Sequence, residues 1–264
     1  MEKVVLVTGA SAGIGKETAS GLAAAGWVVV GASRRGTAAP GWSGLVMDVD
    51  DDASVRDGVA SVLSQHGRLD ALVTCAGWGL AGPAELTPMA DARAQVETNF
   101  WGTVRAVQAV LPSMRANGSG RLVLMSSLGG VLGIPFQAFY SASKFAIEGL
   151  GESLAYEVEP FGIKVTLLEP GNVCTDFTAS RRVVGLNGDG YGPTAAKAIE
   201  VMAKDEANGV PAGDVAAAVV KLLSARRPPR RASVGRASER VGLVGKRVLP
   251  FRLFEAAAKG SLGV

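Results

Sequence analysis

Short apolar runs rich in valine, isoleucine and leucine recur along the chain, separated by longer segments with helical spacing. A strand–helix–strand order of this kind builds right-handed crossovers and a parallel sheet covered on both faces. The runs are continuously apolar, which is typical of strands buried on both sides. We therefore predict an α/β fold, a doubly wound parallel sheet of about seven strands with helices on both faces. The predicted strands cover residues 3–9, 27–33, 43–49, 69–77, 120–127, 162–171 and 230–235.

Nothing in the sequence divides the 264 residues into separate domains. There is no internal repeat and no convincing linker, and 48% hydrophobic residues are enough for a sizeable core. We expect one domain over residues 1–264. A looser Gly-rich segment near 176–212 is a candidate substrate lid, and a basic C-terminal extension lies near 236–264.

Membrane spans and export signals are not expected. No apolar run reaches the roughly 20 residues that cross a bilayer. The start MEKVVLVTGA lacks a basic region followed by a cleavage site. We predict a cytoplasmic protein with no transmembrane segment.

Cysteine and histidine are scarce. Cys75 and Cys174 lie far apart in the sequence, and His66 is the single histidine. A disulfide framework and a Cys/His metal site are therefore not expected. A Ser-His-Asp triad is not expected either, because His66 is the one histidine that could serve in it. We predict no metal and interpret His66 as a surface residue near a helix end.

The stretch VLVTGASAGIGKETA places Gly9, Gly13 and Gly15 between an apolar strand and an Ala-rich helix. Glycines let the backbone pass close to a pyrophosphate, and free N–H groups at a helix start attract its negative charge. This context favours a Rossmann-type dinucleotide site, although a purely structural turn would show the same spacing.

The end of the second predicted strand indicates which dinucleotide is bound. An acidic residue there would hold a ribose diol, whereas arginine suits a 2′-phosphate. The chain has Ser33, Arg34 and Arg35 and no acid at this point, so we expect NADP(H). Asp48, at the end of the third predicted strand, is either a contact to the adenine amino group or a helix N-cap.

With further motifs in the same order, the chain resembles the short-chain dehydrogenase/reductase family over roughly residues 3–235. The motifs are Asn99 in ETNFWGT, Ser127 in LMSS, Tyr140 and Lys144 in YSASK, and PGNVCT. The sequence around these motifs resembles the hydroxysteroid and retinol dehydrogenase branch of the family. The resemblance implies cofactor contacts at Gly9, Ser11, Gly13, Ile14, Gly15, Ser33, Arg34, Arg35, Asp48, Val49, Ala76, Gly77, Asn99, Tyr140, Lys144, Pro170, Gly171, Val173 and Thr175.

Tyr140 and Lys144 stand one helical turn apart, which by itself also fits a solvated surface pair. A free tyrosine has a pKa of about 10, so only on the order of 0.1% is phenolate at neutral pH. A nearby ammonium and a positive nicotinamide ring would favour the phenolate and lower that pKa. We expect Tyr140 to be the general acid/base, Lys144 its charged neighbour and a ligand of the nicotinamide ribose, and Ser127 a hydrogen-bond partner of the substrate oxygen.

The resemblance also implies that Asn99 holds a water that links Lys144 to solvent as a proton relay. A buried amide satisfied by backbone groups is the alternative. The family's Asn-Asn-Ala-Gly turn reads Thr74-Cys75-Ala76-Gly77 here, which puts one hydrogen bond in doubt. We interpret Cys75 as a small buried residue, and Cys174 as a packing residue in preference to a pocket residue.

Apolar residues are expected to face the open side of the nicotinamide. Such a lining favours a lipophilic ketone, aldehyde or alcohol as the substrate. The predicted pocket residues are Trp78, Leu80, Leu128, Leu132, Ile134, Phe136 and Phe177.

Charge is unevenly distributed along the chain. Residues 226–264 hold ten basic and two acidic residues, a net charge of +8, whereas the whole chain carries +3. This end is either an interfacial segment attracted to anionic lipid or a solvated basic cap, and we favour the cap. Nucleic acid is not an expected partner, because no aromatic platform accompanies the charge. The resemblance implies a homodimer or homotetramer built through helices near 88–117 and 138–159.

Together these features predict an NADP(H)-dependent oxidoreductase that interconverts a lipophilic ketone or aldehyde and its alcohol by hydride transfer. Two alternatives stay open: a non-catalytic NADP(H)-sensing protein, and an NAD-dependent alcohol dehydrogenase of the same family. A pure binder would not need Ser127, Tyr140 and Lys144 together, and Arg34 and Arg35 weigh against NAD.

Overall fold

The computed structural model describes most of the chain, including nearly all of the predicted lid. The described residues are 2–186, 190–250, 252–253, 255 and 259–260. Parts of the predicted lid and of the C-terminal extension lie outside them.

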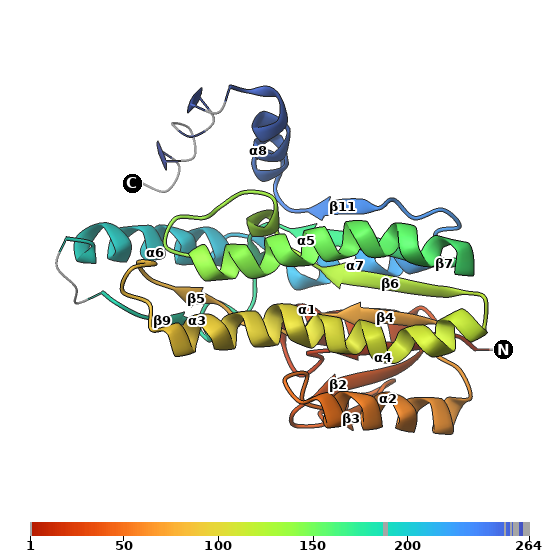
Figure 1. Cartoon of the computed structure of the whole chain (residues 1–264). Coiled ribbons are helices and arrows are strands. Elements are labelled where there is room, and N and C mark those ends of the chain that lie inside the picture. The colour runs from red at the N-terminus through yellow and green to blue at the C-terminus, as the bar shows by residue number, and fades with distance from the viewer. Residues whose placement is uncertain (1, 187–189, 251, 254, 256–258, 261–264) are drawn as a thin grey trace.

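A parallel sheet of seven strands forms the centre of the molecule, as the alternation of strands and helices predicts (Figure 1). Its order is β11-β7-β6-β4-β1-β2-β3, and neighbouring strands are parallel throughout. Every predicted strand is present. The strands are β1 Val4–Thr8, β2 Val28–Ser33, β3 Ser43–Val46, β4 Ala71–Thr74, β6 Gly120–Met125, β7 Ile163–Pro170 and β11 Arg231–Val234.

The strand order reverses direction at β1. The chain runs from β1 to β2 and β3 on one side, then crosses back to β4, β6, β7 and β11 on the other. Loops that leave β1 and β4 therefore diverge, and a crevice opens at the carboxyl ends of these strands. This is the place where a doubly wound sheet binds a ligand.

Helices cover both faces of the sheet. Helices α1 and α7 pack together on one face, and α2, α4 and α5 lie on the other. The bounds are α1 Gly13–Ala24, α2 Asp52–His66, α3 Met89–Val96, α4 Gly102–Ala116, α5 Ala138–Val158, α6 Gly192–Ala207, α7 Ala212–Ser224 and α8 Ala237–Val248.

The central strands bury both of their faces, which explains their continuously apolar sequences. In β1, Val4 and Leu6 belong to the core under α2, α4 and α5, whereas Val5 and Val7 belong to the core under α1 and α7. Successive side chains of a strand point to opposite faces, so an unbroken apolar run supplies both cores.

Some elements were not anticipated from the sequence. The helical stretch 88–118 is divided by a π-helical turn, Glu97–Trp101, between α3 and α4. Two small two-stranded sheets form outside the central sheet, β5 (Leu80–Ala81) with β9 (Arg182–Val183) and β8 (Val173–Cys174) with β10 (Val210–Pro211). Pairs this short carry weak signals in a sequence, because two residues show no period.

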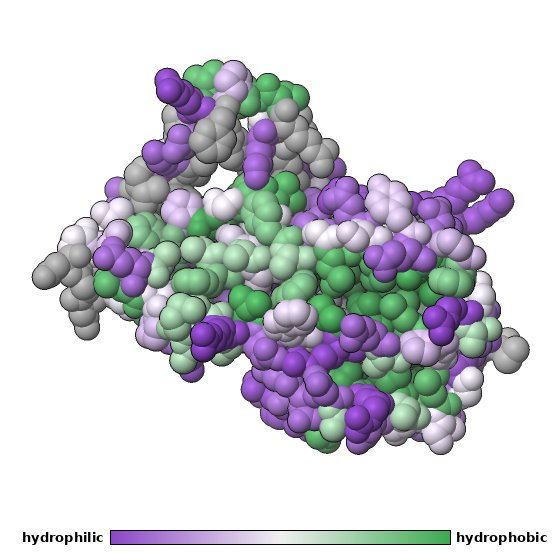
Figure 2. All heavy atoms as spheres, viewed as in Figure 1, coloured by the Kyte–Doolittle hydropathy of each residue, from purple (hydrophilic) through white to green (hydrophobic). Residues whose placement is uncertain are grey.

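The surface mixes polar and apolar regions. Figure 2 shows hydrophobic residues gathered where α4 and α5 face the viewer. Large exposed side chains on or beside these helices include Trp101, Phe145, Tyr156 and Phe161. None of the helices among the described residues combines the length and apolar character of a bilayer span.

Candidate active site

A cavity of about 710 Å³ opens at the carboxyl ends of β1, β2, β4, β6 and β7. It brings together most of the predicted cofactor residues, from seven separate parts of the chain. Arg35 and Gly171 are the two that are not among its lining residues. Those that line it are Gly9, Ser11, Gly13, Ile14, Gly15, Ser33, Arg34, Asp48, Val49, Ala76, Gly77, Asn99, Tyr140, Lys144, Pro170, Val173 and Thr175.

The glycine turn after β1 has the form that a phosphate cradle requires. Gly9 and Gly13 have φ angles of 67° and 50°, in the left-handed region that favours glycine. A Cβ on Gly15 would lie 2.3 Å from the Gly9 carbonyl oxygen, so the turn and α1 are in direct backbone contact. Helix α1 begins after Ala12 without a side-chain cap, and its first residues line the cavity. Uncapped N–H groups suit the negative pyrophosphate of a dinucleotide.

The ends of β2 and β3 supply the groups for the adenosine half. Ser33 and Arg34 line the cavity, and no acid follows β2. Asp48 also lines it and accepts a hydrogen bond from the Asp50 N–H at 3.1 Å. The N-cap alternative for Asp48 is wrong, because Asp51 caps α2 by accepting from the Ser54 N–H at 2.6 Å.

Tyr140, Ser127 and Lys144 meet beside the glycine turn. Tyr140 lies on the first turn of α5, and its hydroxyl is hydrogen-bonded to Ser127, which follows β6. The Lys144 ammonium lies 5.8 Å from the centroid of the Tyr140 ring and donates to the Met125 carbonyl at 2.9 Å. The residues predicted to carry the chemistry are therefore adjacent.

Burial controls the titration of this group. It raises the pKa of Tyr140, an effect that the hydrogen bond with Ser127 opposes. Burial also lowers the pKa of Lys144 to about 8. Desolvation is the largest cause of the Tyr140 shift in the protein itself, and the expectation that Lys144 and a nicotinamide ring together lower this pKa stays a prediction. A raised pKa keeps the phenol protonated at neutral pH, which suits a proton donor.

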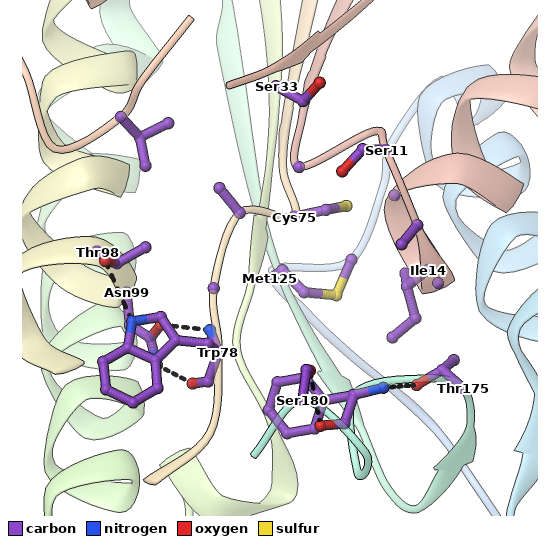
Figure 3. A pocket seen from close by; sticks show the side chains of 18 of the residues that line it. Ser11, Ile14, Ser33, Cys75, Trp78, Thr98, Asn99, Met125, Thr175 and Ser180 are labelled. Atoms are coloured by element: carbon purple, nitrogen blue, oxygen red, sulfur yellow. Dashed lines mark hydrogen bonds between the residues drawn. The ribbon is translucent and has the colours of Figure 1, made fainter. Parts of the chain in front are cut away.

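Asn99 sits in the π-helical turn and is completely buried. Its amide oxygen accepts from the Trp78 N–H at 3.0 Å, and its amide nitrogen donates to the Trp78 carbonyl and to the Ser143 hydroxyl. Figure 3 shows the two bonds to the Trp78 backbone beside the Trp78 indole, which also donates to Thr98. The amide thus satisfies backbone groups, as the alternative interpretation states, and holds the loop after β4. Its part in a proton relay stays a prediction.

The two cysteines differ from each other. Burial raises the pKa of the Cys75 thiol to about 12, so this side chain is an unreactive packing residue that lines the cavity. Cys174 is exposed and does not line the cavity, so both roles considered for it are wrong.

The substrate end of the cavity differs from the predicted apolar lining. Trp78 and Phe177 line it, and the Phe177 ring meets the Tyr140 ring edge-on with centroids 6.0 Å apart. Four polar or charged residues that sequence reasoning missed lie here as well: Asp176, Ser180, Arg182 and Glu206. None belongs to a motif, and all come from the loosely patterned segment after β7.

The other predicted pocket residues are not among those that line the cavity. Leu80 is buried in β5, and Phe136 has a left-handed backbone (φ 59°) whose carbonyl accepts from the Gly82 N–H. Contact of the remaining residues with a substrate stays a prediction. They are Leu128, Leu132 and Ile134.

Comparison with known proteins places this geometry in context. The family model for short chain dehydrogenases matches residues 3–183. A 3-ketodihydrosphingosine reductase of Bacteroides thetaiotaomicron is 40% identical over 260 residues, which cover 97% of each chain. Retinol dehydrogenase 8 of Bos taurus is 36% identical over 250 residues, 87% of this chain and 80% of that one.

Solved structures show the same architecture. A short-chain dehydrogenase from Streptomyces avermitilis superimposes with a TM-score of 0.83 at 33% identity and covers 98% of both chains. ElxO, solved with NADP bound, gives a TM-score of 0.73 at 25% identity over 89% of this chain and 97% of that one.

Proposed function

Because this chain belongs to the short-chain dehydrogenase family and is thus an oxidoreductase, we propose that it reduces a lipophilic ketone or aldehyde to its alcohol with NADPH. The observation that carries this proposal is the meeting of Tyr140, Ser127 and Lys144 beside an uncapped helix start and a glycine cradle in one cavity. A protein that only binds a dinucleotide does not need a hydrogen-bonded phenol at that point.

Each residue has one task in this reaction. Ser127 and Tyr140 hydrogen-bond the carbonyl oxygen and orient it. The Tyr140 hydroxyl, which its raised pKa keeps protonated at neutral pH, donates its proton to this oxygen. Lys144, held by the Met125 carbonyl, places a positive charge near the new phenolate. NADPH, when bound, supplies the hydride that reaches the carbonyl carbon.

Arg34 supports NADPH as the cofactor. It lines the cavity at the end of β2, where no carboxylate is present to bind a ribose diol or to repel a phosphate. The structure of ElxO with NADP bound, a similar fold, is compatible with this choice.

The test is nicotinamide oxidation by the purified protein. NADPH and NADH are compared against a panel of lipophilic carbonyl compounds, with 3-ketodihydrosphingosine first because the Bacteroides relative bears its name. We expect turnover with NADPH preferred, and a loss of at least about 100-fold in kcat in Tyr140→Phe. Equal turnover by Tyr140→Phe would remove the catalytic assignment. Tight NADPH binding without turnover of any compound would favour the sensor alternative.

A further inference from the structure

A buried ion pair lies at the substrate end of the cavity. The Arg181 guanidinium and the Glu206 carboxylate form a salt bridge, and their side chains are 2% and 15% exposed. The Thr178 hydroxyl donates a further hydrogen bond to Glu206. Arg181 and Thr178 belong to the loop between β8 and β9, whereas Glu206 lies near the end of α6. Glu206 lines the cavity, and each of its oxygens keeps a second lone pair for a bound molecule.

The pair is close to the reacting group. A Cβ placed on Gly79 would lie 3.0 Å from the Phe177 ring and 3.5 Å from Arg181 Nε, so these two side chains are neighbours. Phe177 in turn meets the Tyr140 ring. The negative charge of Glu206 raises the pKa of Tyr140, and the positive charge of Arg181 lowers it. A group bound at Glu206 is therefore near the carbonyl that Tyr140 protonates.

A purely structural role for the Arg181–Glu206 ion pair does not account for two observations. Burying an ion pair costs desolvation energy that apolar side chains of similar size would not cost. Arg181 Nε is also buried without a hydrogen-bond partner, so the pair is not fully satisfied as a latch between loop and helix. A pocket for a wholly apolar substrate needs neither charge.

The charges at this end favour a cation. Arg182 pairs with Asp91, and Arg181 pairs with Glu206. Asp176 also lines the cavity, and within the described part of the chain it forms no salt bridge. The Lys144 ammonium offsets the negative charge of Asp176. Of the Arg181–Glu206 pair, however, only Glu206 is among the residues that line the cavity, so the pair presents its negative member to a bound molecule.

We propose that Glu206 binds a protonated amine carried near the reacting carbonyl, so that amino ketones with an apolar chain are the preferred substrates. Arg181 and Thr178 hold the carboxylate toward the cavity, and Trp78 and Phe177 contact the apolar part. This inference rests on the proposed reductase function and adds the substrate class.

The experiment uses two substrates that differ only in charge: a long-chain 2-amino ketone and its N-acetyl derivative. Glu206→Gln keeps the size and the hydrogen-bonding ability of the side chain but removes its charge. We expect kcat/KM for the amino ketone to fall about 10- to 100-fold in Glu206→Gln, and kcat/KM for the N-acetyl compound to change less than about threefold. Glu200→Gln is the matched control, since Glu200 is exposed on the same helix and does not line the cavity. It should behave as the wild type with both substrates.

Each outcome decides between explanations. If kcat/KM of Glu206→Gln falls equally with both substrates, the ion pair is a structural latch. If kcat/KM for the amino ketone is unchanged, the amine binds elsewhere. Either result overturns the inference. Circular dichroism melting shows whether Glu206→Gln stays folded. Calorimetry gives the same comparison without turnover, because it measures binding of the amino ketone to the NADPH-loaded Tyr140→Phe and Tyr140→Phe/Glu206→Gln proteins. Tyr140-dependent reduction of neutral ketones, without reduction of amino ketones, would contradict this inference and leave the proposed function unchanged. No reduction of any carbonyl compound would instead remove the proposed function.

Discussion

Two neighbouring arginines illustrate how much a single position decides. Arg34 and Arg35 both follow β2 and are both exposed, but only Arg34 lines the cavity. Both lie in the turn that follows Ser33, which is closed by a hydrogen bond from the Gly36 N–H to the Ser33 carbonyl at 3.0 Å. Their identical chemistry makes them a natural pair of variant and control.

Arg34→Ala should change the cofactor preference. A charge-assisted hydrogen bond is worth about 1.5–3 kcal/mol, so kcat/KM for NADPH should fall about 10- to 100-fold while the value for NADH stays nearly constant. Steady-state kinetics with both cofactors measures this. Arg35→Ala serves as the control and should retain the wild-type ratio; the same loss in both variants would mean that general charge, rather than a contact, attracts NADPH.

The buried Lys144 predicts a pH dependence. Its pKa is lowered to about 8, so it is charged below that pH and neutral above it, whereas the raised pKa of Tyr140 keeps the phenol protonated to higher pH. If the ammonium supports catalysis, kcat/KM for NADPH in the reduction should be level below about pH 8 and fall toward tenfold per pH unit above it. A profile that stays level to pH 10 would contradict this role. Lys144→Arg, which stays charged, should lose the inflection even if its rate is lower.

At the scale of elements, helix α5 connects the site to the core. Its first two turns carry Tyr140 and Lys144, and its later turns pack against β7 through a close approach at Gly151. A Cβ on Gly151 would lie 2.6 Å from Cδ2 of Leu167, which is buried in the core. Gly149, two residues earlier, has nothing within 4 Å of the same position.

These two glycines give a stability prediction. Gly151→Ala should lower the free energy of unfolding by about 1–2 kcal/mol, because overpacking costs about 1–3 kcal/mol and the better helix propensity of alanine returns up to about 1. Gly149→Ala should be neutral or stabilise by up to about 1 kcal/mol. Urea unfolding followed by circular dichroism measures both. Equal effects at the two positions would show that α5 is not held as closely to β7 as the distances indicate.

The π-helical turn shows how one element shapes another. It places Asn99 so that both of its amide groups bond to the backbone of Trp78, and Gln95 donates to the same Trp78 carbonyl at 2.7 Å. The loop after β4, which lines the cavity, is therefore fixed from one helix. π-turns of this kind are rare and occur often at functional sites.

At the scale of the whole molecule, several large apolar side chains are exposed to solvent in a single copy of the chain. Trp101, beside α4, is 48% exposed, and Phe145 and Tyr156 are exposed on α5. The sequence predicts a homo-oligomer through these helices, and a face of this kind fits that prediction. Closed symmetric dimers and tetramers are the common outcome for such a patch.

Substitution of Trp101 tests this. We expect the wild type to have the mass of a dimer or tetramer by size-exclusion chromatography with light scattering, and Trp101→Glu to shift toward a smaller species because a buried charge weakens an interface. Val46→Glu is the control, since Val46 is 69% exposed on β3 at the opposite edge of the sheet. A monomeric wild type, or an equal shift in both variants, would exclude this face as the interface.

Local patterns in the sequence determined the seven strands, their parallel sheet, the glycine turn and the residues around Tyr140. Each of these depends on neighbours within a few positions: a strand needs a short apolar run, a cradle needs glycines at fixed spacing, and a helical pair needs four residues. The comparisons and the geometry agree with that part. Only the tertiary structure decided that Arg34 rather than Arg35 lines the cavity, that burial raises the pKa of Tyr140, and that Arg181 and Glu206 lie beside Phe177. These contacts join segments 25 or more residues apart or depend on how deeply a group is buried, and neither separation nor depth is written in a local pattern.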